Sequence, residues 1–215
     1  MQGEIDSLRS LVFVQSKVSD ALRNEVNRLQ QFTRRPCISI SGIDKTRGES
    51  KDDLQKSIQG ILDEVDCDVT LHDVDKFHRD GPTYDGFKQD IIVRFKSHAA
   101  KESVYRARKS TTGRVRIRPS LTKSNKILLD EARNVLKNYN VDNSNMKNPP
   151  VAVFPNIHGE IQVKFTEDTK KGMFIGFNSI EQLAHILSCA ESESVHELDV
   201  WNFSESETDS DSGSD

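Results

Sequence analysis

Hydrophobic positions in the first 33 residues recur at the spacing of an amphipathic helix. No proline occurs before Pro36, and Gly3 is the one glycine of the segment. Apolar residues at the heptad a and d positions are Leu8, Leu11, Val18, Leu22, Leu29 and Phe32. Such a stripe is buried either against another chain in a coiled coil or against the chain's own body. We predict a coiled-coil oligomerisation segment over residues 1–35, forming a dimer or trimer through residues 1–33.

After Pro36 the pattern alternates between strand and helix periods. Strands are expected at 37–43, 69–74, 90–95 and 114–118, and helices at 50–65 and 97–107. Ser50 and Asp53 have capping-box spacing, and Ser97 opens the second helix. The order β-α-β-β-α-β over residues 36–119 predicts a four-stranded sheet with two helices on one face, the topology of the RNA recognition motif.

A second small α+β domain is predicted over residues 120–190. Thr122 is expected to cap a helix that ends near Asn140, followed by strands at 151–154, 160–165 and 173–177. Ser179 and Gln182 have capping-box spacing ahead of a last helix. Residues 191–215 are acidic and rich in serine, which predicts a disordered tail. The expected fold class is therefore α+β.

The charges are distributed unevenly along the chain. The 215 residues contain 30 Lys and Arg against 34 Asp and Glu, but the segment 191–215 holds nine acidic residues and no Lys or Arg. The segment 94–118 holds nine Lys and Arg and one acidic residue, Glu102. A basic run of this kind indicates a surface for a polyanion, with a solvated basic face as the alternative.

The composition also bears on compartment and chemistry. Three cysteines lie far apart without a CxxC pair, which favours a reducing intracellular compartment, and no apolar run approaches the roughly 20 residues of a membrane span. Cys67, His72 and His78 match no zinc spacing, and no hydrolase, nucleotide-binding or metalloprotease motif occurs. We expect no enzyme activity, no cofactor and no metal.

The alternation Arg114-Val-Arg-Ile-Arg118 places three guanidinium groups on one face of a strand. Single-stranded RNA or DNA, bound through its phosphates with little sequence preference, is the expected ligand. The candidate binding residues are Arg94, Arg106, Arg108, Lys109, Arg114, Arg116, Arg118, Lys123 and Lys126.

Aromatic residues are missing where an RNA recognition motif stacks bases on its sheet. Ser39 stands at the aromatic position of the first strand, and Asp90 and Ile92 replace the aromatics of the third. Stacking on sheet aromatics supplies much of the single-strand affinity of that fold. Either this sheet binds nothing, or binding has moved to its charged edge.

The chain resembles two related families in an ordered set of segments. These are residues 37–43, 90–95, 115–118 and 128–133. The most specific shared element is Leu121-Thr-x-x-Asn125. One of the two families is the baculovirus few-polyhedra protein family with its cellular relatives, whose members also end in a Ser/Asp/Glu tail. The other is the first open-reading-frame protein of LINE-type retrotransposons.

The few-polyhedra resemblance implies a non-enzymatic homo-oligomeric viral protein of the host cytoplasm and nucleus and of the virion nucleocapsid. It implies effects on nucleocapsid envelopment, occlusion and the balance of budded and occluded virus, with viral structural proteins as partners. The retrotransposon resemblance implies a trimeric nucleic-acid chaperone with RNA-contacting arginines at Arg106, Arg108 and Arg116. That protein is strongly basic, whereas this chain has a net charge of −4. A third hypothesis is a protein-interaction scaffold with a vestigial RNA-binding sheet.

The acidic tail offers expected phosphorylation sites. Ser204, Ser206, Thr208 and Ser212 each have an acidic residue three positions later, a pattern that acid-directed kinases prefer. A flexible acidic tail is expected to compete with nucleic acid for the basic run, and phosphorylation would add about 1.5–2 negative charges per site.

Overall fold

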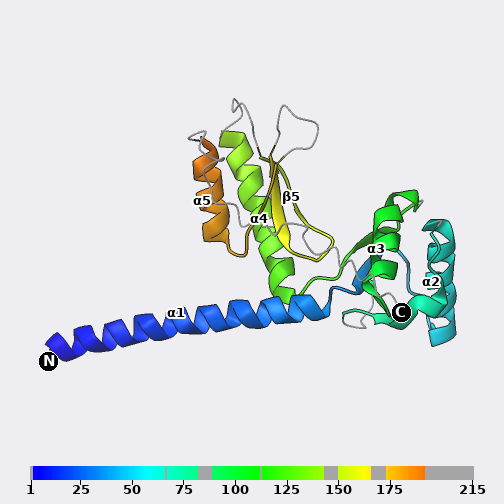
Figure 1. Cartoon of the computed structure of the whole chain (residues 1–215), viewed down its shortest axis with the longest axis horizontal. Coiled ribbons are helices and arrows are strands. Elements are labelled where there is room, and N and C mark those ends of the chain that lie inside the picture. Colours follow the sequence, from blue (N-terminus) through cyan, green and yellow to red (C-terminus); the bar gives the residue numbers. More distant parts are fainter. Residues whose placement is uncertain are drawn as a thin grey trace, which may run out of the picture. The chain divides into compact units, whose positions relative to one another are not determined.

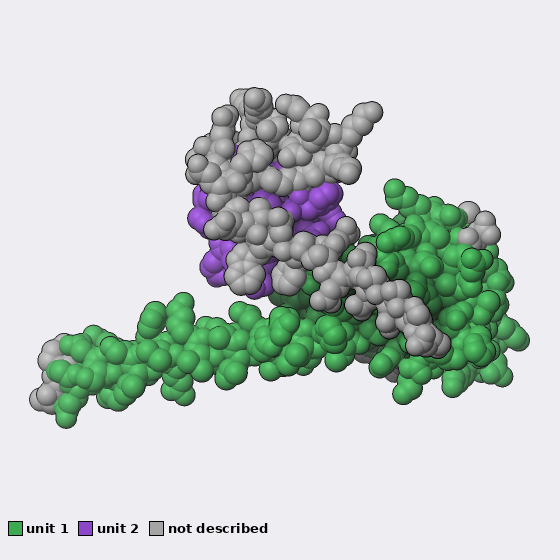
Figure 2. All heavy atoms as spheres, viewed as in Figure 1, with its two compact units in different colours: residues 1–127, 155–160 green, residues 128–154, 161–215 purple. Residues whose placement is uncertain are grey.

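The computed structural model describes residues 2–65, 67–81, 89–111, 113–142, 150–165 and 173–191. It is an α+β protein that divides into two compact units (Figures 1 and 2). Unit 1 comprises residues 1–127 and 155–160, and unit 2 comprises residues 128–154 and 161–215. These limits differ from the predicted boundary at residues 119 and 120, because the start of one helix and one turn pack with the first unit.

Unit 1 contains the long helix α1 (Gln2–Thr33) and a four-stranded sheet. The elements follow the predicted order as β1 (Cys37–Ser41), α2 (Lys51–Val65), β2 (Val74–Arg79), β3 (Ile91–Phe95), α3 (His98–Ala107) and β4 (Arg116–Pro119). Neighbouring strands are antiparallel in the order β2-β3-β1-β4.

The core of unit 1 lies between one face of this sheet and α2 and α3, which lie next to each other in Figure 1. Its largest fully buried side chains from the strands are Ile38, Ile40, Ile91, Val93 and Phe95. The helices contribute Leu54, Ile58, Ile61, Leu62, Val65 and Val104. Burial of each large apolar side chain contributes about 1.5–3 kcal/mol, so this layer fixes which sheet face remains outside.

The predicted helix caps are present. Ser50 and Asp53 form a reciprocal capping box, in which the Asp53 N–H donates to Ser50 Oγ over 3.2 Å and the Ser50 N–H donates to Asp53 Oδ2 over 3.0 Å. Ser97 accepts from the Ala100 N–H over 3.1 Å, and Thr122 accepts from the Asn125 N–H over 3.1 Å. Local hydrogen bonding therefore starts these helices where the sequence predicts.

Two of the predicted strands begin at other residues than the sequence indicated. The prediction of a strand over 69–74 is wrong: Leu71–Asp73 is a 3₁₀ turn, and the strand begins at Val74. Thr70 and Asp73 cap each other and stop extended pairing there. β4 begins at Arg116 rather than Arg114, because Gly42 ends β1 with φ +93° and leaves Arg114 without a strand partner.

Unit 2 contains most of α4 (Lys123–Asp142), a sheet in the order β5-β6-β7 and α5 (Ile180–Glu191). The strands are β5 (Pro150–Pro155), β6 (Ile161–Phe165) and β7 (Met173–Gly176). Figure 1 shows α4 and α5 side by side next to β5. The Tyr139 hydroxyl donates to the Leu187 carbonyl over 3.2 Å and links the two helices.

A buried polar joint holds three segments of unit 1 together. The Gln31 amide nitrogen donates to the carbonyls of Ser120 (2.9 Å) and His158 (3.1 Å). Its oxygen accepts from the Thr122 N–H (3.0 Å) and the Asn125 side chain (3.3 Å). This joint fixes the end of α1 to the segment after β4 and to the turn at 156–160.

Most of α1 makes no such contact. The seam residues Leu8, Leu11, Val18, Leu22, Leu29 and Phe32 are 53–65% exposed, and Gln31 is the one buried side chain among those described for this helix. The predicted helix is confirmed, and its apolar stripe is exposed along residues 8–32. None of the described helices is long and apolar enough to cross a membrane.

Self-association through this stripe is tested by charge substitution rather than truncation, since truncation would also remove Gln31. We expect Leu11→Lys/Leu22→Lys to convert an oligomer into a monomer, because each lysine places a charge in the seam. Light scattering of the full chain measures the protomer number. Ser10→Lys/Asn24→Lys, off the seam, is the matched control, and an equal protomer number in all three chains would contradict the prediction.

The joint gives a second prediction. Gln31→Ala leaves the buried partners of the amide unpaired and should lower the free energy of unfolding by about 1–3 kcal/mol. Urea unfolding followed by circular dichroism measures the change. Gln30→Ala, at the exposed neighbouring position, is the control and should change stability by less than about 0.5 kcal/mol. Equal effects of the two substitutions would show that the joint does not stabilise the unit.

Candidate nucleic-acid interface

The outer face of the sheet in unit 1 is defined by strand register. Ile38 pairs with Val93 and Ile40 with Ile91 on the buried face. The alternate positions form rows on the other face, in which Lys76, Arg94 and Cys37 share one row and His78, Ile92, Ser39 and Arg118 share the next. A further row joins Ser41 to Arg116. The outer face thus ends at β4, an edge strand with two arginines.

Arg114, Arg116 and Arg118, here named the arginine strip, are all exposed. Arg116 and Arg118 lie on the outer side of β4, opposite the buried Ile117, and Arg114 lies just before the strand. Arg116 donates to the carbonyls of Gly113 (3.1 Å) and Val115 (2.8 Å), which orients its guanidinium. Within the described part of the chain, no carboxylate pairs with any of the three.

Three other candidate residues are occupied by acidic partners. Arg94 lies 3.4 Å from Asp75, Arg106 lies 2.6 Å from Glu102, and Lys126 lies 3.3 Å from Asp80. Each pair offsets part of the charge that would attract a phosphate, although the basic side chains are more than half exposed. Lys109 and Lys123 are exposed and form no ion pair among the described residues.

The helix-end candidates do not share the outer sheet face. Arg108 and Lys109 lie in the 3₁₀ turn Arg108–Ser110, which contacts α2 in the helix layer. The Arg108 guanidinium lies 3.9 Å from the centre of the Tyr105 ring and donates to the Tyr105 carbonyl over 2.7 Å. The ring is therefore stacked on Arg108. The residues of the predicted groove therefore belong to two layers. Arg106, Arg108 and Lys109 belong to the helix layer, and the arginine strip belongs to the sheet.

The centre of the outer face has no stacking platform. Ser39 is 8% exposed, and its hydroxyl donates to Asp90 Oδ2 over 2.8 Å. Ile92 beside it is 7% exposed. At this centre the described side chains offer no aromatic ring for a base, as expected both for a sheet that binds nothing and for one that binds at its charged edge.

Lys76 on β2 was missed by the sequence reasoning. It is exposed and lies directly across from Arg94 on the outer face. The signal was the alternation of Lys76 and His78 with Phe77, which the wrong placement of the second strand concealed.

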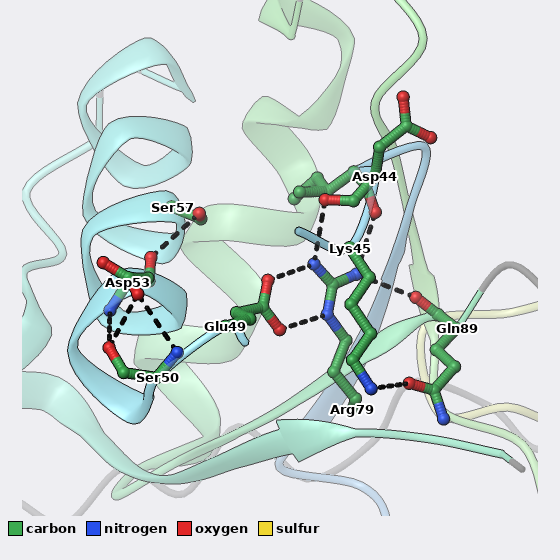
Figure 3. A network of polar contacts seen from close by, with 9 residues as sticks. Asp44, Lys45, Glu49, Ser50, Asp53, Ser57, Arg79 and Gln89 are labelled. Atoms are coloured by element: carbon green, nitrogen blue, oxygen red, sulfur yellow. Dashed lines mark hydrogen bonds and ion pairs between the residues drawn. The ribbon is translucent and has the colours of Figure 1, made fainter. Parts of the chain in front are cut away.

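Arg79 shows how a basic residue can be withdrawn from ligand binding (Figure 3). Its guanidinium forms two bonds with Glu49, at 2.8 and 3.1 Å, and both side chains are less than 10% exposed. The remaining donors reach the carbonyls of Ile43 (2.8 Å), Gln89 (2.9 Å) and Asp44 (3.3 Å). All five donors are used, so Arg79 fixes the loop after β1 and has no donor left for a phosphate.

A cationic cluster surrounds the turn that packs into unit 1. The His98 and His158 rings stack with centroids 5.3 Å apart. Lys101 is fully buried, and its ammonium donates to the Ile157 carbonyl. Arg35 lies 3.6 Å from Glu160, and His98 lies 4.0 Å from Glu102.

Burial governs the ionisation of this cluster. Desolvation lowers the pKa of Lys101 from 10.5 to about 8. Desolvation, assisted by Lys101, lowers the pKa of His98, while Glu102 opposes the shift. Desolvation, assisted by Arg35, His98 and Lys101, lowers the pKa of His158, while Glu160 opposes the shift. Protonation of the pair would bring further positive charge to Lys101 and Arg35.

The predicted phosphorylation sites Ser204, Ser206, Thr208 and Ser212 lie outside the described residues. Within the described ranges, no three His, Cys, Asp or Glu side chains are grouped so that they could hold a metal ion. Comparison of the sequence with protein-family models and with curated proteins found no match.

The histidine pair predicts a pH dependence of stability. Each ring has a lower pKa folded than unfolded, so as the pH falls through about 6.5 the unfolded chain binds protons first. Stability is therefore retained above that pH and decreases below it. Urea unfolding between about pH 8 and pH 5.5 measures the slope. His98→Gln/His158→Gln should flatten it and His72→Gln, at an exposed position, should not; equal slopes in all chains would contradict this assignment.

Proposed function

We propose that the chain is a non-enzymatic, self-associating protein that binds single-stranded nucleic acid through the β4 edge of a degenerate sheet of the RNA-recognition-motif type. The single observation in favour is the arginine strip, which is exposed and has no carboxylate partner among the described residues. Arginines at an exposed edge bind phosphates with little regard for base identity. Lys123 extends the proposed contact, whereas Lys109 lies in the helix layer. Arg94, Arg106 and Lys126 contribute less because of their ion pairs.

We further propose that this activity serves viral assembly, as in the few-polyhedra family that the sequence resembles. The exposed seam of α1 supports an oligomer, in which several arginine strips would act on one strand. The net charge of −4 favours this role over that of a strongly basic retrotransposon chaperone.

The arginine strip is tested by Arg114→Ala/Arg116→Ala/Arg118→Ala. Each lost phosphate contact should reduce the slope of log affinity against log salt by about 0.7, giving a total of about 2. Fluorescence anisotropy with a labelled single-stranded oligonucleotide across salt concentrations measures this slope.

The control removes the same charge from arginines that already have partners. Arg9, Arg23 and Arg133 are each paired with a carboxylate on their own helix. Arg9→Ala/Arg23→Ala/Arg133→Ala should leave most of the slope intact. Equal affinity and slope in a folded strip variant and the unaltered chain would favour the scaffold hypothesis.

A further inference from the structure

The sheet of unit 2 carries two aromatic rings on the face away from its core. Val163 and Ile175 pair across β6 and β7 and are at most 5% exposed, so the face they occupy is the one packed in the core. Lys164 pairs with Phe174 on the opposite face. Phe154 contacts Phe174 edge to face, with ring centroids 5.8 Å apart, so a ring from each outer strand leans over β6.

Among the described strand residues around the two rings, no side chain carries a negative charge. Phe174 is 43% exposed, and the small residue Gly176 lies opposite Gln162 in the neighbouring row. The Lys164 ammonium lies 5.7 Å from the centre of the Phe174 ring. None of β5, β6 and β7 contains an aspartate or glutamate. The face therefore combines ring surfaces, one cation and one amide.

We propose that this face, the Phe154/Phe174 platform, stacks the bases of single-stranded nucleic acid, with Lys164 contacting the phosphates. A pair of sheet aromatics beside a cation is the arrangement by which single strands are held without sequence preference. This inference rests on the proposed function and adds a contact that the described residues at the centre of the unit 1 sheet do not supply. There the outer face has Ser39, Asp90 and Ile92, and the Tyr105 ring is stacked on Arg108.

The platform and the arginine strip have different energetic signatures. Phosphate contacts release counterions and depend on salt, whereas base stacking is lost when the base is removed. An oligodeoxyadenylate and an abasic oligomer of the same length therefore separate the two. The unaltered full chain should bind the intact oligomer about tenfold or more tighter than the abasic one.

The test variant is Phe154→Leu/Phe174→Leu, which keeps apolar bulk and removes the rings. It should lose the preference for the intact oligomer, keep its affinity for the abasic oligomer and keep the salt slope. Phe174→Tyr, which retains a ring, should restore the part of the preference owed to Phe174. Phe13→Leu is the matched control, because Phe13 is 63% exposed on α1 with the Lys17 ammonium 5.6 Å from its ring centre.

Four results would overturn the proposed stacking platform. The platform is overturned if the double variant keeps the preference for the intact oligomer, or if the unaltered chain binds both oligomers equally. Either result is compatible with binding through the arginine strip. Failure of the unaltered chain to bind either oligomer would overturn the proposed function and the platform with it. A lower protomer number for the double variant in light scattering would assign the face to a second copy of this chain, and would also overturn the platform.

Discussion

The side-chain amide of Gln31 is the interaction on which the arrangement of the first unit depends. It lies near the end of a helix whose other described side chains are half-buried or exposed, yet it is itself 6% exposed. Its nitrogen donates twice and its oxygen accepts twice. A polar group buried in this way costs free energy whenever one partner is lost. The end of α1, the segment after β4 and the turn at 156–160 are consequently ordered together.

This constraint explains the segment Leu121–Asn125, the most specific element of the sequence resemblance. Thr122 accepts from the Asn125 N–H as the cap of α4, and its hydroxyl donates to Asn27 over 2.6 Å. The Asn125 amide bonds Gln31, Asn27 and the Gly159 carbonyl. Gly159 has φ +83°, and a Cβ there would overlap the Gln31 amide. The segment therefore holds the end of α1 against the rest of unit 1. Because it begins three residues after Arg118, it also lies next to the arginine strip in the sequence.

Ion pairing sorts the basic residues of unit 1 into two classes. Arg79 is fully satisfied inside the unit, and Arg94, Arg106 and Lys126 each have a carboxylate within 3.4 Å. The arginine strip has none among the described residues. Because a paired carboxylate offsets part of the attraction to a phosphate, the arginine strip is the group of neighbouring arginines that best fits the proposed contact with a polyanion.

The sequence by itself determined the features that arise from neighbours along the chain. The helix at residues 2–33, the capping residues Ser50, Ser97 and Thr122, and the opposed faces of Ile117 and its flanking arginines all follow from spacing within a few residues. The sequence also showed that Ser39 and Asp90, rather than aromatic residues, stand in the first strand and just before the third. Tertiary structure decided which distant groups meet. Gln31 meets Thr122 across 91 positions, and Phe154 meets Phe174 across β6. Periodicity cannot reveal such contacts, because they depend on strand register and on the close approach of segments that share no local pattern.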